Sequence, residues 1–155
     1  IFYRFEKNLH ERHVSVAVVV QKMAESEVSG ICFTAHPVTK DLNQMVIEAG
    51  WGLGEAIVGG IITPDTYIID KPTLAILDVN VSRQEKMISQ STAGTKETAV
   101  LGERQSIQKI SNQQILALAK ICKKIEEHYG APQDIEWAFV KEKFFIVQSR
   151  PITTL

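Results

Sequence analysis

The chain has 155 residues, of which 45% are hydrophobic, and 17 Lys and Arg residues against 18 Asp and Glu residues leave a net charge of -1. A chain of this size buries roughly 68–70% of its unfolded surface, so its length predicts one domain, or most of one. The near-zero charge, without a basic run, argues against nucleic acid as a partner. Apolar stretches such as residues 16–20 are far below the roughly 20 residues of a membrane span. No signal peptide opens the chain, so we expect a cytoplasmic protein without membrane contact.

The first part of the chain predicts the end of a helix and then three strands. Residues 1–9 mix aromatic and charged side chains and are typical of a helix whose beginning is absent. Residues 14–23 are β-branched on both faces, which predicts a central strand of the sheet, buried on both sides. Residues 29–34 and 45–49 predict two more strands. This part of the sheet is therefore expected to be a meander.

A glycine cluster at residues 50–54 precedes Glu55. Glycines let backbone amides approach a phosphate, and the start of a helix favours anions. No Gly-Lys-Ser/Thr follows, however, and the spacing does not fit Gly-x-Gly-x-x-Gly. Two interpretations stay open: a direct contact to the phosphates of a nucleotide, and a tight strand-to-helix turn. In the same way Glu48 and Glu55 either assist a metal ion or a ribose or are capping and solvated groups.

The middle of the chain predicts a hairpin and a loop. Residues 66–70 and 74–78 have strand character and flank Lys71-Pro72, which favours a turn. Residues 82–108 are the least hydrophobic stretch, and we interpret them as an irregular loop or flap.

The clearest helix of the sequence covers residues 115–129, where apolar side chains recur at helical spacing. Ser111 and Gln114 form a capping-box pattern ahead of it. Gly130 supplies a left-handed cap, and Pro132 prevents continuation. Together with the strands, this helix predicts an α+β fold: a mainly antiparallel sheet with a long helix packed on one face.

The last quarter of the chain carries an acid pair, Asp134 and Glu136, and then a glutamine and an arginine, Gln148 and Arg150. Along residues 134–139 apolar and polar side chains alternate, which puts the core on one face of a strand and function on the other. Two adjacent strands with these polar residues could hold magnesium and a phosphate chain. That is the chemistry of an ATP site.

The register of these two strands decides whether their polar residues meet. A two-residue turn at residues 141–142 sets Glu136 opposite Val147, which separates the polar sets. A three-residue turn that includes Lys143 sets Glu136 opposite Gln148, and the other acid opposite the arginine. We favour this second register, although the turn has no glycine, and a bulge gives the same outcome. The alternative is an ordinary cross-strand ion pair between the acid and the arginine on a solvated face.

The two cysteines, Cys32 and Cys122, sit in apolar patterns without metal-ligand spacing. We therefore expect free, buried thiols and no zinc site.

Several segments, taken in this order, resemble the nucleotide-binding domain of phosphoenolpyruvate synthases, and the resemblance covers nearly the whole chain. They are residues 18–23, 29–34, 52–58, 63–65, 128–130, 134–138 and 146–151. The same domain occurs in rifampicin phosphotransferases and, with more divergence, in pyruvate phosphate dikinase. The resemblance implies an ATP-grasp fold that moves a phosphoryl group from ATP to a histidine on a separate swivelling domain.

By this resemblance Glu136 and Gln148 are the magnesium ligands, and Arg150 contacts the transferring phosphate as the catalytic arginine. Gln21 and the backbone near Met23 form the adenine-binding hinge. Magnesium takes one or two oxygen ligands from protein and leaves the rest to water and phosphate, so one carboxylate and one amide carbonyl suit it. A planar guanidinium stabilises the charge that develops in phosphoryl transfer.

The resemblance also implies missing parts. In this family a first subdomain, upstream in the chain, supplies the phosphate-binding lysine, so we expect residues 1–155 to be the second, C-terminal half of the ATP-grasp domain in a larger multidomain protein. The start at Ile1 rather than Met fits a fragment. The chain has four histidines, His10, His13, His36 and His128. None of them lies in the Gly-Gly-x-Thr-Ser-His-like context of the phosphate acceptor.

The function that the resemblance favours is that of a phosphoenolpyruvate synthase, which converts ATP, pyruvate and water to phosphoenolpyruvate, AMP and phosphate. Residues 34–39 and 61–65 resemble the synthases most. The fragment alone is expected to be inactive. The alternatives are a rifampicin phosphotransferase, a pyruvate phosphate dikinase-like domain, or a nucleotide-binding module without turnover.

Overall fold

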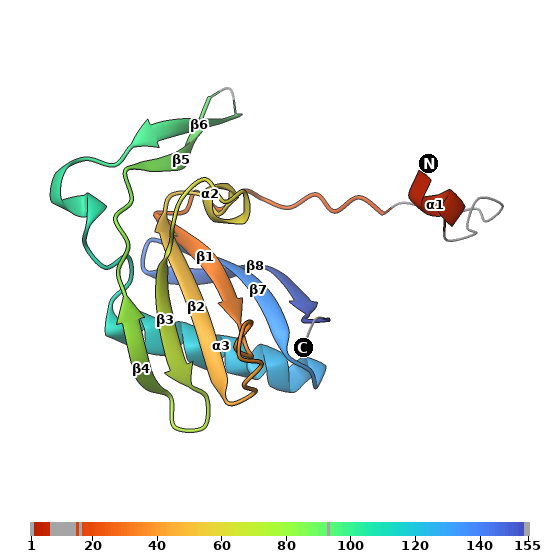
Figure 1. The fold of residues 1–155 in the computed structure, drawn as a ribbon. Coiled ribbons are helices and arrows are strands. Elements are labelled where there is room, and N and C mark those ends of the chain that lie inside the picture. Colours follow the sequence, from red (N-terminus) through yellow and green to blue (C-terminus); the bar gives the residue numbers. More distant parts are fainter. Residues whose placement is uncertain (1, 7–14, 16, 93, 154–155) are drawn as a thin grey trace.

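The computed structural model describes residues 2–6, 15, 17–92 and 94–153. Within them a six-stranded antiparallel sheet in the order β4-β3-β2-β1-β7-β8 lies against one long helix, and a separate two-stranded sheet stands beyond one end (Figure 1). The large sheet consists of β1 (Val28–Phe33), β2 (Gln44–Trp51), β3 (Asp65–Asp70), β4 (Ala75–Asn80), β7 (Gln133–Val140) and β8 (Lys143–Pro151). The remaining elements are α1 (Phe2–Glu6), α2 (Glu55–Val58), β5 (Lys86–Ser91), β6 (Gly94–Ala99), the 3-10 helix η1 (Gly102–Gln105) and α3 (Asn112–Tyr129).

The hydrophobic core lies between α3 and one face of the large sheet. Ile115, Leu118, Ala119 and Cys122 follow one another at helical spacing on α3 and are all buried. They pack against alternate residues of the central strands, among them Met45, Ile47, Tyr67, Ile69, Ile135 and Trp137. The predicted α+β fold, with a mainly antiparallel sheet and the long helix on one face, is confirmed.

Helix α3 begins and ends as its sequence predicts. The Gln114 amide donates to Ser111 Oγ, and the Ser111 amide donates to Gln114 Oε1 at 2.8 Å, which completes the capping box. Gly130 ends the helix in the left-handed conformation, with φ of 67°. No described helix is long and apolar enough to cross a membrane.

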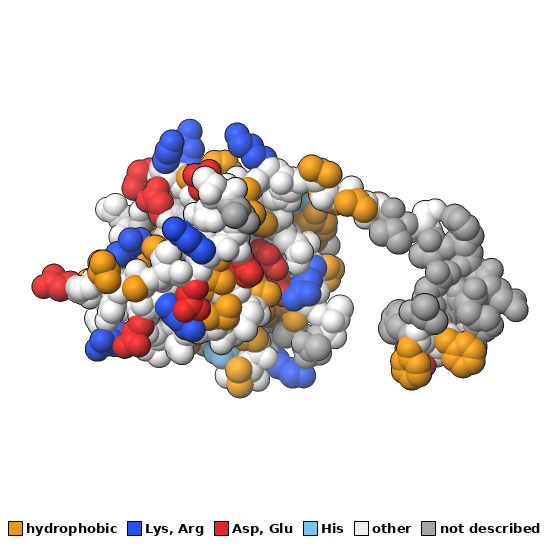
Figure 2. Space-filling view, turned by 90° about the horizontal axis from the view of Figure 1, so that it is seen from above, with side chains coloured by type: hydrophobic (Ala, Val, Ile, Leu, Met, Phe, Trp, Pro, Cys, Tyr) orange, Lys and Arg blue, Asp and Glu red, His pale blue; other side chains and the backbone are white. Residues whose placement is uncertain are grey.

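The prediction of a central strand at residues 14–23 is wrong for the residues that the structure describes. Residues 17–23 form no strand, and Val18, Val19 and Val20 are 82%, 83% and 95% exposed. The segment leaves the body as an extended arm with apolar side chains along it (Figure 2). β-branched side chains favour extended backbone, but a strand also needs a neighbour, and both sides of β1 are occupied by β2 and β7. Residues 14 and 16 lie outside the described part. Of the predicted helix end at residues 1–9, the structure describes residues 2–6, which form α1.

The prediction of an irregular loop over residues 82–108 is also wrong in part. This stretch contains the hairpin β5–β6, paired from Lys86 with Ala99 to Ser91 with Gly94, and then η1. Its low hydrophobicity is explained by its exposure, because Ile88 is the one residue of β5 that is buried. Without a buried face, a hairpin of this kind lacks the alternation by which strands are recognised.

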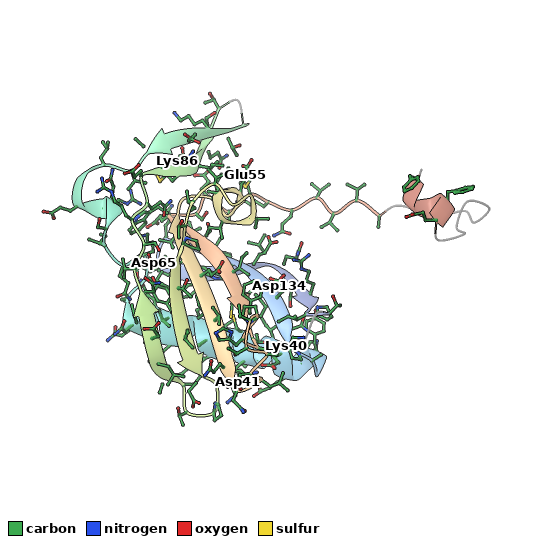
Figure 3. All side chains as sticks on the ribbon, viewed as in Figure 1. Lys40, Asp41, Glu55, Asp65, Lys86 and Asp134 are labelled. Atoms are coloured by element: carbon green, nitrogen blue, oxygen red, sulfur yellow. The ribbon has the colours of Figure 1, made fainter. Side chains whose placement is uncertain are left out.

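A buried ion pair joins the large sheet to the segment around the hairpin. Asp65 lies at the start of β3 (Figure 3). Its side chain and that of Lys109 have 0% exposure, and Lys109 Nζ lies 2.8 Å from Asp65 Oδ1. The same carboxylate accepts hydrogen bonds from the Tyr67 hydroxyl, the Ser82 amide and the Lys109 amide. Burial, followed by the charge of Asp65, raises the pKa of Tyr67. The carboxylate thus has partners on both oxygens, which is the condition for keeping a charge inside a protein.

Both thiols are free and buried, as the sequence predicts. Cys32 on β1 faces Cys122 on α3, and burial together with a hydrogen bond to Cys122 raises the pKa of Cys32. These cysteines belong to the core.

Candidate functional site

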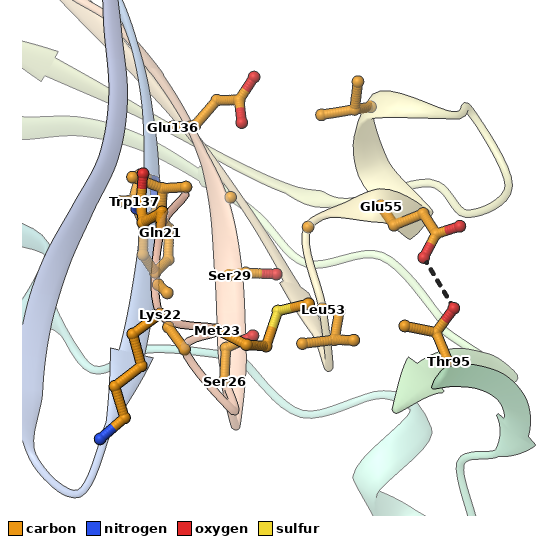
Figure 4. A pocket seen from close by; sticks show the side chains of 16 residues that line it. Gln21, Lys22, Met23, Ser26, Ser29, Leu53, Glu55, Thr95, Glu136 and Trp137 are labelled. Carbon is orange, nitrogen blue, oxygen red and sulfur yellow. Dashed lines mark hydrogen bonds between the residues drawn. The ribbon is translucent and has the colours of Figure 1, made fainter. Parts of the chain in front are cut away.

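A cavity of about 440 Å³ opens on the sheet face opposite α3, close to the end where α2 and the hairpin stand (Figure 4). Its floor is formed by β1 and β7, one wall by the arm, and the other wall by α2 with the preceding loop. The lining residues are Gln21, Lys22, Met23, Ala24, Ser26, Ser29, Gly30, Leu53, Gly54, Glu55, Val58, Thr95, Glu136, Trp137, Ala138 and Val147. Of the residues predicted for the site, Gln21, Met23 and Glu136 are in this cavity.

The glycine loop, residues 50–54, forms part of one wall of the cavity, and two of its backbone amides form hydrogen bonds within the protein. The Gly52 amide donates to Glu27 O at 3.1 Å, and the Leu53 amide donates to Ile88 O at 2.8 Å. The Gly52 carbonyl accepts the hydroxyls of Ser26 and Ser29 at 2.9 and 2.7 Å. These bonds favour the interpretation of residues 50–54 as a strand-to-helix turn, because the amides of Gly52 and Leu53 are not free to bind a phosphate.

Glu55 and Thr95 close the cavity on the hairpin side. The Thr95 hydroxyl donates to Glu55 Oε2 at 3.2 Å, which joins β6 to the first turn of α2 (Figure 4). The sequence did not point to Thr95, because its segment was interpreted as an irregular loop or flap. A contact between residues 40 positions apart leaves no local pattern in a sequence.

Strands β7 and β8 bring the predicted polar residues together. Glu136 pairs with Gln148, and Asp134 pairs with Arg150, so the favoured register is confirmed. The three-residue turn is wrong: Val140 pairs with Lys143 across a two-residue turn, and the register shifts after Glu136. Because a bulge places two residues opposite one, this shift restores the pairing that the turn alone would lose.

The bulge also contributes to the cavity. Glu136 faces Gln148 whereas Trp137 faces Ile146, so Val147 is the additional residue on β8. Val147 lines the cavity. Bulges commonly redirect a side chain next to a functional site, and this one places an apolar group beside Glu136.

Arg150 is held by Asp134. Its Nε and one terminal nitrogen donate to Asp134 Oδ2 at 2.8 and 2.6 Å. The hydrogen bonds and charge of Asp134 raise the pKa of Arg150. The arginine side chain is 66% exposed, against 13% for the aspartate, so the ion pair orients the guanidinium and leaves its other N–H donors toward solvent.

Glu48 lies on the same sheet face, one strand beyond β1. It is half-buried, and burial, followed by the charge of Asp134, raises its pKa. No hydrogen bond or ion pair joins its carboxylate to any residue within the described ranges. The sequence left its role open.

The donor set on this face fits magnesium rather than zinc. Glu136 and Gln148 place a carboxylate and an amide oxygen side by side, and hard oxygen donors of this kind are the ligands that Mg²⁺ takes. Among residues 2–6, 15, 17–92 and 94–153, no group of three His, Cys, Asp or Glu side chains converges on a metal site. A magnesium ion here would therefore take most of its ligands from water and substrate.

Comparison with known proteins identifies this arrangement as a nucleotide-binding domain. Residues 1–155 match the family described as pyruvate phosphate dikinase, AMP/ATP-binding domain. The chain belongs to this family.

The curated relatives are enzymes of greater length. The chain is 45% identical over 156 residues to the probable phosphoenolpyruvate synthase of Methanocaldococcus jannaschii, covering 100% of this chain and 13% of that protein. It is 46% identical over 163 residues to the phosphoenolpyruvate synthase of Pyrococcus furiosus, covering 99% and 20%. The rifampicin phosphotransferase of Bacillus cereus is 39% identical over 155 residues, covering 100% and 18%. The chain thus spans about a fifth or less of the length of these three relatives.

Proposed function

We propose that residues 1–155 are the C-terminal half of an ATP-grasp domain that binds Mg²⁺ and ATP in a phosphoenolpyruvate synthase, a cytoplasmic enzyme. The observation that carries this proposal is the pairing of Glu136 with Gln148 beside a cavity to which the arm contributes Gln21 and Met23. The higher identity to the synthases than to the phosphotransferase supports pyruvate as the final acceptor.

In this proposal each part of the site has one task. Gln21 and the backbone at Met23 bind adenine on the arm side of the cavity, where apolar side chains from the other wall, Leu53 and Val58, cover the ring. Glu136 and Gln148 are the protein ligands of magnesium. The bound ion neutralises phosphate charge, and this is the chemistry that it adds to the site.

Arg150 stabilises the charge of the phosphoryl group in transfer. Two of its five N–H donors are on Asp134, which fixes the plane of the guanidinium, and three remain for phosphate oxygens. Preorganised donors of this kind need no rearrangement during the reaction, and each contributes several kcal/mol in known enzymes, roughly 3–4. The phosphoryl group then passes to a histidine on a swivelling domain of the same protein, with an upstream ATP-grasp half completing the site.

The test is a pair of measurements. In the full-length protein, Arg150→Ala is expected to lower AMP formation by about 10²–10³-fold, because it removes donors that act on the transition state. Thermal stability should fall only slightly, since Arg150 itself is largely exposed and the loss is that of the partner of Asp134. Retained activity would show that Arg150 is structural. In parallel, an amide NMR titration with a non-hydrolysable ATP analogue should shift Gln21, Met23 and Glu136, more strongly when magnesium is present, and shifts confined to other residues would refute the site.

A rifampicin phosphotransferase is the second candidate, since the rifampicin phosphotransferase of Bacillus cereus matches the whole chain at 39% identity. AMP and phosphate formation that depends on pyruvate distinguishes the synthase. The same reaction dependent on rifampicin would assign the phosphotransferase instead.

A further inference from the structure

Strand pairing places Glu48 in one row with the two proposed magnesium ligands. Glu48 on β2 pairs with Ile31 on β1, Ile31 pairs with Glu136 on β7, and Glu136 pairs with Gln148 on β8. Residues that pair across antiparallel strands project from the same face of the sheet. The row therefore presents three oxygen-bearing side chains, with one isoleucine between the two acids.

Nothing in the packing of the sheet explains an acid at position 48. The interior of a strand favours β-branched and aromatic residues, and the half-buried Glu48 carboxylate has no hydrogen bond or ion pair among the described residues. The charge of Asp134 adds to the effect of burial in raising the pKa of Glu48, so the two carboxylates repel each other. Asp134 pairs with Arg150 and Asp65 pairs with Lys109, whereas Glu48 pairs with no cation among the residues that the structure describes. An unpaired, partly desolvated carboxylate costs stability. The position of Glu48 on this face is therefore best explained by a cationic ligand.

We propose that Glu48 is a positioning residue of the magnesium site, accepting a hydrogen bond from a water bound to the ion that Glu136 and Gln148 hold. This inference rests on the proposed function. It assigns Glu48 a role in orienting the hydrated ion between the sheet and the phosphates.

The spacing supports contact through water rather than direct ligation. Glu48 and Glu136 are separated by β1, so their Cα atoms are about 9.6 Å apart, twice the distance between neighbouring strands. A magnesium ion lies about 2 Å from each ligand oxygen and commonly keeps several waters. A bound water adds the reach that lets Glu48 act across Ile31. This also agrees with the finding that no three acidic, His or Cys groups in the described ranges converge on one point.

The experiment compares the magnesium dependence of nucleotide binding in variants of the full-length protein. The dissociation constant of adenosine 5′-(β,γ-imido)triphosphate is measured by calorimetry at a series of free Mg²⁺ concentrations. Groups that hydrogen-bond to a metal shell affect metal affinity by about 10–100-fold, so Glu48→Gln should raise the Mg²⁺ concentration for half-maximal effect by that factor. Affinity for the nucleotide without Mg²⁺ should be unchanged or higher, because a negative charge near the phosphates is removed.

Asp78→Asn is the matched control. Asp78 lies on the same sheet face, since it pairs with Ile68 and Ile68 pairs with Val46, but it is exposed on the outer strand β4. Its Mg²⁺ dependence should equal that of the wild type. Thermal unfolding in EDTA gives a second readout: Glu48→Gln should melt at or above the wild-type temperature, and a lower melting temperature would show that Glu48 supports the fold instead.

The outcomes separate the two proposals. Equal Mg²⁺ dependence of Glu48→Gln and wild type, with Glu136→Gln strongly impaired, overturns the role of Glu48 and leaves the proposed function standing. If Mg²⁺ does not affect nucleotide binding in the wild type, both proposals are wrong. Impairment of both variants, with Asp78→Asn unaffected, supports both.

Discussion

Replacing Lys109 by Met is expected to destabilise the fold by about 3–5 kcal/mol, because it leaves a buried carboxylate without its counter-charge. Methionine keeps the apolar stem of the lysine and removes only the ammonium. The side chains of Lys109 and Asp65 are 0% exposed, so water cannot replace the lost partner. The Tyr67 hydroxyl and the two backbone amides remain on Asp65 and satisfy its oxygens, but they carry no positive charge.

The assay is urea unfolding of the purified chain, followed by tryptophan fluorescence, with calorimetry as a check. For a chain of this length about 1 kcal/mol lowers the melting temperature by roughly 2–4 °C, so the expected decrease is roughly 6–20 °C. Asp65→Asn alone should lower the free energy of unfolding by a similar amount, because it leaves the buried Lys109 ammonium without a counter-charge, with the Ser82 carbonyl as its remaining partner.

The double variant Asp65→Asn/Lys109→Met is the decisive comparison. Removing both charges restores a neutral interior, so its destabilisation should be smaller than the sum of the single effects by about 0.5–3 kcal/mol. Additive effects, or a Lys109→Met protein within about 0.5 kcal/mol of wild type, would refute a coupled buried pair.

Three further predictions concern the sheet, the long helix and pH. Gly30→Ala should destabilise the fold by about 3 kcal/mol in urea unfolding, since the new Cβ would lie 1.8 Å from Glu48 O and 2.6 Å from Trp137 Cζ2. Ser111→Ala removes the helix cap and should cost about 1 kcal/mol in the same assay, with Ser111→Asn as the conservative control that retains most of it. Burial, followed by the charge of Asp134, raises the pKa of Glu48, so the folded state binds the proton of Glu48 more tightly than the unfolded state does. The contribution of Glu48 to the free energy of unfolding therefore falls as the pH rises from its unfolded pKa through its folded pKa. Without metal, the melting temperature of Glu48→Gln should not show this fall with pH. A pH profile identical to that of the wild type would contradict this prediction.

The sequence predicted the pairing of β7 and β8 better than the turn that joins them. Alternation along residues 134–139 identifies the buried face because it repeats over a whole strand. The turn offers only two residues, and Lys141 and Glu142 adopt φ values of 47° and 62° without a glycine. Such a turn carries a modest strain, which the pairing of two long strands outweighs. A local rule therefore gave the wrong turn, and the side-chain pattern gave the right partners.

Residues 17–23 show the opposite failure. Their β-branched composition is typical of a strand, yet the described residues are extended and exposed. Composition measures how well a segment fits a sheet, whereas pairing depends on which other segments are present beside it. In the large sheet β1 has neighbours on both sides, so the arm has no place there.

The wall of the cavity could not be predicted for a related reason. Glu55, Thr95 and Leu53 come together through two long-range contacts. The Thr95 hydroxyl donates to Glu55, and the Leu53 amide of the glycine loop donates to the carbonyl of Ile88 on β5. None of these contacts repeats along the chain, so no periodicity reveals them. The resemblance predicted site residues on β7, β8 and the arm, where the residues follow motifs, and it left α2 and the hairpin open.

The bulge in β8 divides the last hairpin into two parts with different tasks. Beyond the bulge, toward the turn, Phe144 packs on Trp137 and Phe139, with ring centroids 5.6 and 4.8 Å apart. These aromatic contacts hold β8 against the core and determine which face of the hairpin is buried. On the other side of the bulge, the pairs of Glu136 with Gln148 and Asp134 with Arg150 lie on the exposed face. Since the aromatic part stabilises the hairpin, the polar part is free to be optimised for a ligand, which is why charges can stand in a strand that belongs to the main sheet.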